Sequence, residues 1–295
     1  MQLLEFYFPD FNKYSRAFRK LTLTISCFLI IRGEDSMSTL TTLKKSKRLG
    51  FLATGSELVT GELLNTNSQI MADASLQHGI HIGEHILVDD DQTNIQEAFR
   101  FLLSRHDGVI TTGGLGPTSD DLTRNAIAQV LNLELVFSPE SYERILNRLM
   151  KKFGWDIHKI PKSNKNQAYF PAGSRIIPNL NGSADACEIK FKNKIIYLLP
   201  GPPKECLPLF SEDVLPSLLN SNFGSEKKLY RWRLQGVPEA QMAELLEHEL
   251  KKYNLIFGYR AHSPYLDIKL NLSPGPDLED ILNLVGKLVR PYLIK

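Results

Sequence analysis

The sequence predicts an α/β fold with a mainly parallel sheet that has helices on both faces, followed by a small α+β domain. Between residues 49 and 131, short apolar runs alternate with segments that are apolar at helical spacing. Such alternation is typical of βαβ units. From Asn220 to Lys228 the composition changes to Ser, Asn, Gly and Lys, which indicates a linker before the second domain.

Each element of the first domain follows from its apolar pattern. The run 49–54 ends at Gly55, and Ile70, Met71, Ala74 and Leu76 share one helical side before Gly79. The expected strands are 49–54, 80–88, 108–112 and 194–199, with short extended pieces at 176–177 and 188–191. The expected helices are 68–77, 95–103, 126–131 and 141–153.

The second domain reads as a βαββα unit. We expect strands at 230–234, 255–259 and 266–272 and helices at 240–250 and 278–289, because alternation and helical periodicity succeed one another in that order. The expected domain bounds are 48–222 for the larger domain and 228–295 for the smaller one.

Residues 1–47 differ in composition from the predicted domain that begins at residue 48. Leu21 to Ile31 is apolar behind Arg16 and Arg19, but this run is too short to span a bilayer and no small-residue cleavage site comes after it. We expect translation to start at Met37, with the preceding residues disordered or not translated.

Composition limits the classes of function. A chain of 295 residues is long enough for about two domains. A net charge of +2 offers no argument for a nucleic-acid or membrane partner. The three cysteines, Cys27, Cys187 and Cys206, show no metal-ligand spacing, which favours a reduced cytoplasmic setting and small core residues.

The segment Thr111 to Thr123 is the centre of the predicted site. Its three glycines, Gly113, Gly114 and Gly116, follow a buried strand and precede a helix, and glycines there would let a phosphate approach backbone N–H groups. Asp120 and Asp121 would repel a bare phosphate, so a divalent cation between them is expected. The alternative is an ordinary turn in which Asp120 or Asp121 caps the helix.

Other polar groups also follow predicted strands. They are Ser56 and Glu57 after the first strand and Asp89 to Asp91 after the second. Ligands of open parallel sheets bind beyond the carboxyl ends of the strands, so these groups and the central glycine motif are expected to converge on one site. Pro200 to Glu205 form another junction of strand, turn and helix after the strand 194–199, for which a rigid strand exit is the alternative.

These motifs together resemble the molybdopterin-binding MoaB/MogA-like superfamily, and specifically the amino-terminal part of the CinA family. The resemblance covers about residues 48–219 and extends to Asn65-Thr66-Asn67, Asn164 and Gln167-Ala168. It implies that Asp90 and Asp121 are the functional acids and that they hold a metal. We expect Asp120 to be a further metal ligand because it is paired with Asp121 in the same turn. Glu57 is a catalytic candidate that could orient a water molecule or a ribose hydroxyl, and the alternative is a helix cap or a supporting role. The substrate-binding residues we expect are Gly113, Gly114, Gly116, Thr123, Asn65, Asn67, Asn164, Gln167, Gly182, Ser183, Pro200, Gly201 and Glu205.

Two functions remain open on the sequence. The resemblance implies a metal-dependent pyrophosphohydrolase that uses Mg, Mn or Co and acts on ADP-ribose or a similar nucleotide diphosphate compound. The alternative is a non-catalytic module that binds molybdopterin or a nucleotide. In both cases the partner is a phosphate-containing small molecule such as ADP-ribose, FAD or a molybdopterin-like compound. No nucleic-acid or membrane partner is expected, and a homo-oligomer is.

The chain departs from the family in two respects. The carboxyl-terminal nicotinamide mononucleotide deamidase domain of full-length relatives is expected to be absent. A turn that the family builds as Gly-Thr-Ala-Pro-Gly reads Gly182 to Ala186 here, with Asp185 in place of proline. We expect Asp185 to repel a phosphate, so that Asp185→Pro with Ala186→Gly tightens binding. Asp121→Asn is expected to remove hydrolysis and leave the fold intact.

Overall fold

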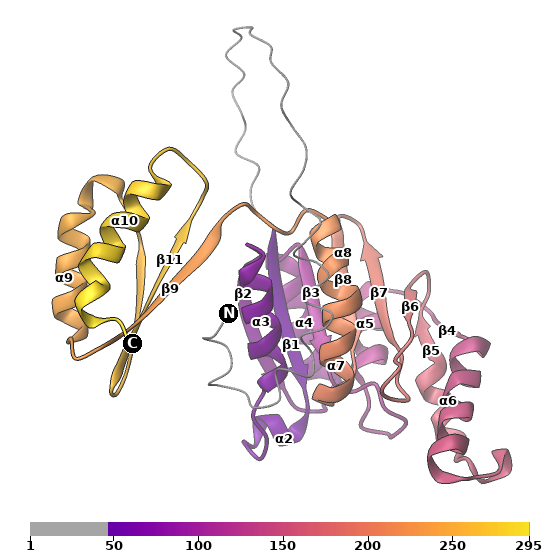
Figure 1. Ribbon diagram of the computed structural model, residues 1–295. Coiled ribbons are helices and arrows are strands. Elements are labelled where there is room, and N and C mark those ends of the chain that lie inside the picture. The colour runs from indigo at the N-terminus through magenta and orange to yellow at the C-terminus, as the bar shows by residue number, and fades with distance from the viewer. Residues whose placement is uncertain (1–46, 295) are drawn as a thin grey trace, which may run out of the picture.

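The structure is a computed structural model that describes residues 47–294 (Figure 1). The predictions for the amino-terminal extension and for a start at Met37 therefore lie outside the described residues. Within residues 47–294, no helix is both long and apolar enough to cross a membrane.

The larger domain is built on a six-stranded sheet with the order β2-β1-β3-β8-β7-β6. Strands β2, β1, β3 and β8 run parallel, and β7 and β6 continue the sheet in antiparallel fashion. The bounds are β1 Arg48–Thr54, β2 His81–Val88, β3 Gly108–Thr112, β6 Arg175–Ile177, β7 Ala186–Phe191 and β8 Lys194–Leu199. The mainly parallel sheet predicted from the sequence is confirmed.

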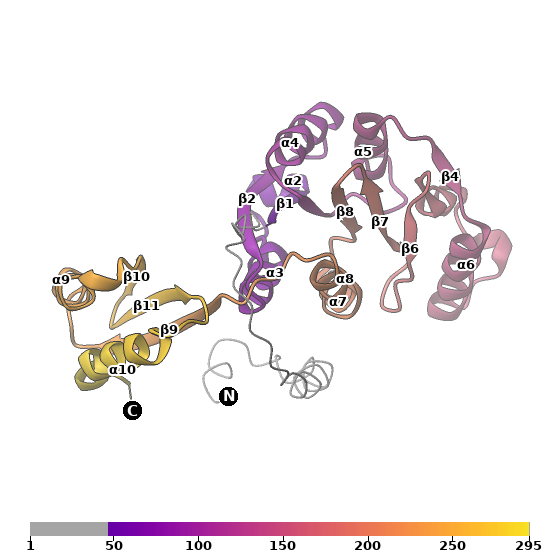
Figure 2. The ribbon, with the colours of Figure 1, turned by 90° about the horizontal axis from the view of Figure 1, so that it is seen from above.

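Helices cover both faces of this sheet, as predicted (Figure 2). One face packs against α3 (Thr66–Gln77), α7 (Pro203–Leu209) and α8 (Leu215–Asn220), with η4 (Phe210–Val214) joining the last two. The other face packs against α4 (Gln92–Arg105) and α5 (Thr123–Leu131). A short helix, α2 (Ser56–Val59), follows β1 and was not predicted.

The central strands are apolar because both of their faces are covered. Every residue of β3 is buried, whereas the edge strand β2 alternates between exposed and half-buried residues. Tyr197 of β8 belongs to one core cluster, and its neighbours Ile196 and Leu198 belong to the other. Successive residues of a central strand therefore point into the apolar cores on opposite faces of the sheet. This explains why these strands are continuous apolar runs and do not alternate between apolar and polar residues.

A small unit lies at the far edge of this domain. Helix α6 (Pro139–Phe153) leads through η2 (Ile157–Lys159) and η3 (Lys162–Ala168), and β4 (Leu135–Phe137) pairs with β5 (Tyr169–Pro171). Only α6 was predicted. Strands of three residues are too short for a period of two to stand out in the sequence.

The smaller domain is an antiparallel sheet of order β10-β11-β9 with two helices. Its elements are β9 Lys228–Gln235, α9 Glu239–Glu249, η5 Lys251–Tyr253, β10 Phe257–His262, β11 Tyr265–Leu272, α10 Leu278–Val289 and η6 Arg290–Tyr292. The predicted βαββα order is present. The strand expected at 255–259 begins later, because Asn254 adopts a left-handed conformation with a φ of 49° and turns the chain first.

Helix α3 connects the two domains. Asp73 of α3 forms an ion pair with Arg231 of β9, and the Ser225 hydroxyl donates to the Gly79 carbonyl over 2.8 Å. At its other end, the Asn67 amide donates to the Gly201 carbonyl over 2.7 Å, next to the carboxyl ends of the strands.

An ion-pair network in the smaller domain makes its stability depend on pH. Partial burial alone would raise the pKa of Asp267, but hydrogen bonds from Arg233 and His262 lower it to about 2. An unfolded Asp has a pKa of about 3.9. The stabilisation is therefore fully present above about pH 4 and is lost as the pH falls through about 2.

We predict that Asp267→Asn lowers the free energy of unfolding by about 1 kcal/mol at pH 7, a value reduced by partial solvent exposure. Urea unfolding of both proteins between pH 7 and pH 2 measures the difference, which should shrink below pH 4. A difference that stays constant over this range contradicts the prediction.

Candidate functional site

The motifs predicted to form the site meet at the carboxyl ends of β1, β3 and β8. The Gly113 N–H donates to the Leu199 carbonyl over 3.1 Å. A Cβ placed on Gly201 would lie 3.4 Å from the Gly113 Cα, and Asn67 is bonded to the Gly201 carbonyl. Three segments that are far apart in the sequence thus form one surface, as expected of parallel strands.

The ends of β1 and β2 are joined by Asp90. Its Oδ2 atom accepts from the Ser56 N–H over 2.8 Å and from the Ser56 hydroxyl over 3.0 Å. Glu57 is exposed beside them on α2. Asp90 thus fastens the turn after β1 to the end of β2.

The segment 113–122, here called the glycine-rich loop, requires its glycines for packing. Gly113 and Gly114 have φ values of 99° and 63°. A side chain on Gly113 would overlap the Thr54 carbonyl, and one on Gly114 would overlap the buried Thr123 hydroxyl. The space that each glycine leaves is therefore filled by the protein itself.

This geometry corrects the expected role of two loop N–H groups. The N–H of Gly113 is bonded to Leu199 and that of Gly116 to Asp121, so neither is free to hold a phosphate. Thr123 is likewise engaged, since its hydroxyl lies 3.0 Å from that of Thr54. That these residues contact a ligand in some other way remains a prediction.

Asp121 holds the glycine-rich loop in shape. Its carboxylate accepts from the Gly116 N–H over 2.6 Å, the Thr118 N–H over 2.8 Å and the Thr118 hydroxyl over 2.5 Å. The alternative in which Asp120 or Asp121 caps α5 is wrong, because Leu122 occupies that position without a side-chain cap. Asp120 is exposed, and hydrogen bonds from Thr118 and from the backbone lower its pKa.

The predicted metal ligands do not form a ready coordination set. Within residues 47–294, no three His, Cys, Asp or Glu side chains are grouped so that they could hold a metal ion. Asp121 uses both of its oxygens within the loop, and Asp90 uses one of its oxygens on Ser56. The expected Mg, Mn or Co ion therefore stays a prediction.

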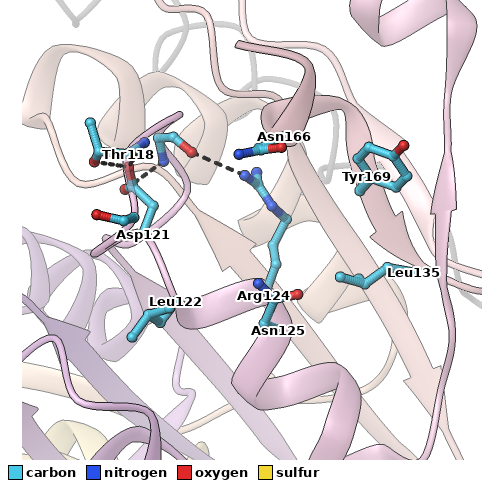
Figure 3. Close-up of a pocket in the computed structure, with 10 residues that line it drawn as sticks. Thr118, Asp121, Leu122, Arg124, Asn125, Leu135, Asn166 and Tyr169 are labelled. Carbon is cyan, nitrogen blue, oxygen red and sulfur yellow. Dashed lines mark hydrogen bonds between the residues drawn. The ribbon is translucent and has the colours of Figure 1, made fainter. Parts of the chain in front are cut away.

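A cavity of about 270 Å³ lies between the glycine-rich loop and the unit of α6, η3, β4 and β5 (Figure 3). Most of its wall is polar, and a tyrosine ring and two leucines complete it. The lining residues are Gly116, Thr118, Ser119, Asp121, Leu122, Arg124, Asn125, Leu135, Asn166 and Tyr169.

Arg124 is the charged residue of this cavity that was not predicted from the sequence, and Ser119, Asn125, Asn166 and Tyr169 were not predicted as site residues either. It is 4% exposed, and its guanidinium extends from the start of α5 toward Asn166 (Figure 3). Burial lowers its pKa to about 10, against smaller opposing effects of Cys187 and Asp121, so it stays charged at neutral pH. A signal existed: Arg124 precedes the buried residues Ile127, Ala128 and Leu131 at helical spacing on one face.

The remaining predicted ligand-binding residues lie either near the Gly201 turn or near the turn that contains Ser183. In the first group, Asn65 caps α3, where its side chain accepts from the Ser68 N–H over 3.2 Å, and Pro200 directly follows β8 and precedes Gly201. Gln167 donates to the Ser183 hydroxyl over 3.2 Å, and Asn164 donates to the Pro161 carbonyl over 3.0 Å.

The turn that begins at Gly182 packs against Glu205. A side chain on Gly182 would overlap the Glu205 carboxylate, which accepts from the Asn179 amide over 2.6 Å. Arg148 donates to the carbonyls of Asn179 and Gly182 and so closes the turn from the side of α6. Both Gly182 and Glu205 are thus committed to contacts within the protein.

The expectation that Asp185 repels a phosphate is wrong in its physical premise. Asp185 is 3% exposed and receives hydrogen bonds from Arg144 (2.6 Å), the Ser141 hydroxyl (2.7 Å) and the Asn179 N–H (2.8 Å). Its charge is compensated by Arg144. Asp185 therefore ties α6 to the turn, and it does not face a ligand as an unpaired carboxylate.

The two cysteines among residues 47–294 are core residues, as predicted. Cys187 and Cys206 are buried and free, and each belongs to one of the two apolar clusters. Burial raises the pKa of Cys187 to about 12 and that of Cys206 further, which keeps both as unreactive thiols.

The comparison with protein families decides the relationship. The family described as probable molybdopterin binding domain matches residues 50–220, which is the domain that carries the glycine-rich loop and the cavity. The chain belongs to this family. The match contains each of the strands whose ends meet at the site and confirms the resemblance found in the sequence.

Members of the CinA family are among its relatives. A protein provisionally named competence-damage inducible in Alkaliphilus metalliredigens is 40% identical over 200 residues, which are 66% of this chain and 46% of that protein. A CinA-like protein of Dictyoglomus thermophilum is 39% identical over 204 residues, 69% of this chain and 48% of its own length. The chain spans about half the length of the curated relatives it matches.

The fold of the present chain is similar to that of a relative whose structure has been solved. The crystal structure of CinA from Thermoplasma acidophilum, whose function is described as unknown, superposes with a TM-score of 0.52 at 28% identity. It covers 59% of this chain and 97% of that one. The MoaB/MogA-like fold class predicted from the sequence is therefore confirmed, and the smaller domain adds an antiparallel sheet to it.

The sequence analysis expected Asp121→Asn to leave the fold intact, but the contacts of Asp121 predict that this substitution destabilises the protein. The new amide NH₂ would face an N–H donor, that of Gly116 or, with the amide flipped, that of Thr118, so we predict a loss of about 1–3 kcal/mol in the free energy of unfolding. Chemical denaturation measures it, and Asp120→Asn is the matched control, expected to stay within about 0.5 kcal/mol of wild type. Equal stability of the two variants would mean that the loop does not depend on Asp121.

The contacts of Asp185 predict that Asp185→Ala destabilises the protein by about 2–3 kcal/mol, because it leaves the Asn179 N–H and Ser141 hydroxyl without their partner. Asp156→Ala, at a side chain that is 65% exposed, is the control. By the same reasoning Asp185→Pro with Ala186→Gly should lower stability and should not tighten binding. A thermal unfolding curve unchanged from wild type refutes this role.

Proposed function

We propose that the domain of residues 48–222 binds a phosphate-containing small molecule of the molybdopterin or nucleotide class. The observation that carries the proposal is the cavity of about 270 Å³ whose wall is formed by the glycine-rich loop. The family name supports the same class of ligand. This is the binding-module alternative of the sequence analysis, which the findings favour over the hydrolase.

The lining of the cavity agrees with such a ligand. Hydroxyl and amide groups of Ser119, Asn125 and Asn166 can bond polar atoms, and the Tyr169 ring offers an aromatic surface for a heterocycle. Pockets for whole drug-sized ligands measure roughly 300–1,000 Å³. A cavity of this size therefore holds one part of the molecule, and the rest extends along the strand ends toward Gly201.

Pyrophosphate hydrolysis is the second candidate, and the half-buried Asp90 and the exposed Glu57, which flank Ser56, favour it. Asp90 is fixed there by two hydrogen bonds, and Glu57 is the next residue along α2. Two carboxylates flanking one turn are a suitable arrangement for placing a water molecule. Under this candidate the substrate is ADP-ribose or a similar compound, and a homo-oligomer in the cytoplasm remains a prediction.

Calorimetric titration of the full chain with ADP, ADP-ribose, FAD and free pyrophosphate tests the proposal, and adenosine is the control without phosphate. We predict binding of the phosphate compounds and a loss of at least about tenfold in affinity for adenosine, as removal of charged hydrogen bonds implies. If all five compounds bind equally well, or if none of them binds, the proposed function is wrong.

Rates measured in parallel with Mg, Mn or Co separate the two candidates. Turnover of ADP-ribose that is lost in Asp90→Asn, with binding retained, would establish the hydrolase. Binding without turnover under all metal conditions would establish the binding module.

A further inference from the structure

We propose that Arg124 binds an oxyanion of the ligand, a phosphate or pyrophosphate group, inside the cavity beside the glycine-rich loop. The inference rests on the proposed function and deepens it by naming the residue that recognises the anion. It also implies that the ligand-free protein carries a buried positive charge without a partner.

The hydrogen bonding of the guanidinium is incomplete. Arg124 is 4% exposed, and one of its nitrogens, Nη2, donates to the Gly116 carbonyl over 3.3 Å. A second nitrogen, Nη1, is buried and has no hydrogen-bond partner. A buried donor without a partner is rare in folded proteins and calls for a specific explanation.

The charge of Arg124 is also left without an ion pair. In the described part of the chain, no Asp or Glu oxygen lies within ion-pair distance of its guanidinium, which has a single neutral carbonyl as its bonded partner. Asp121 is the acid of the same cavity wall, but its carboxylate is bonded to Gly116 and Thr118. Buried arginines are otherwise found paired, because removal of a charge from water is costly.

The position of Arg124 directs it toward a ligand. It lines the cavity together with Ser119, Asn125 and Asn166, and its guanidinium lies beside Asn166 (Figure 3). Guanidinium groups bind phosphate oxygens through two parallel N–H bonds, which a lysine cannot do. An oxyanion at this position would accept a hydrogen bond from Nη1 and would also compensate the positive charge of the guanidinium.

Two half-buried arginines of this domain show how a structural arginine uses its donors. Arg144 binds the Asp185 carboxylate with two nitrogens, and Arg148 binds three carbonyls of the turn 179–182. Both use their guanidinium donors to join two segments of the chain. Arg124 makes one hydrogen bond, to the loop that directly precedes its own helix.

Pyrophosphate titration of wild type, Arg124→Met and Arg124→Lys at fixed ionic strength tests the inference. Arg100→Gln, on the exposed side of α4, is the control that loses a positive charge outside the cavity. We expect Arg124→Met to weaken pyrophosphate binding by roughly 10- to 100-fold, as loss of a charged hydrogen bond implies. Arg124→Lys should fall between the two, and Arg100→Gln should match wild type.

The Tm of the ligand-free proteins distinguishes a binding arginine from a structural one. Removal of a structural arginine would lower the Tm. We expect the Tm of Arg124→Met to equal or exceed that of wild type, since an unpaired buried charge has been removed. The upward shift of Tm that pyrophosphate produces in wild type should be absent in this variant.

The outcomes separate the two proposals. If wild type and Arg124→Met bind pyrophosphate within about twofold of each other, Arg124 is not the anion-binding residue, while the proposed function stands. If wild type binds neither pyrophosphate nor ADP, both proposals fail. If Arg124→Met does not fold, Arg124 is structural after all, unless Arg124→Lys folds and shows the expected intermediate affinity.

Discussion

The close approach of the ends of β1, β3 and β8 is the constraint on which the site depends. Gly113 lies directly against the Thr54 carbonyl and next to Gly201, and a side chain at Gly113 has no room. Because these strands are parallel neighbours, their carboxyl ends meet at one edge and bring three distant segments together. The absence of a Cβ at Gly113 thus allows the three strand ends to approach one another and form one surface.

The glycine-rich loop above these ends is shaped by one carboxylate and bordered by one cation. Asp121 uses both of its carboxylate oxygens on Gly116 and Thr118 of the loop. Arg124, three residues further on, keeps a buried donor without a partner. Such an unsatisfied group costs stability, which is a feature that folded proteins tolerate mainly at functional sites.

Much of the larger domain could be predicted, because its strands are buried on both faces and its helices are strongly periodic. The strands β3 and β8 of this domain, and the helix α10 of the smaller domain, have the bounds expected from the sequence. The approach of Asp90 to Ser56 was expected from the topology, because both follow neighbouring parallel strands, whereas Asn67 was expected only from the family resemblance. Side-chain partners could not be predicted: Asp185 meets Arg144 across 41 positions of sequence, and only the fold reveals that this charge is paired.

Helix α3 is fixed at both ends by contacts of different kinds. A helix of 12 residues is about 18 Å long and behaves as a stiff rod. One end is bonded through Asn67 to the Gly201 turn, and Asp73, further along the helix, forms an ion pair with Arg231 of the smaller domain. A reorientation of the smaller domain would therefore have to break this ion pair or move α3 with it, although the two domains share no core.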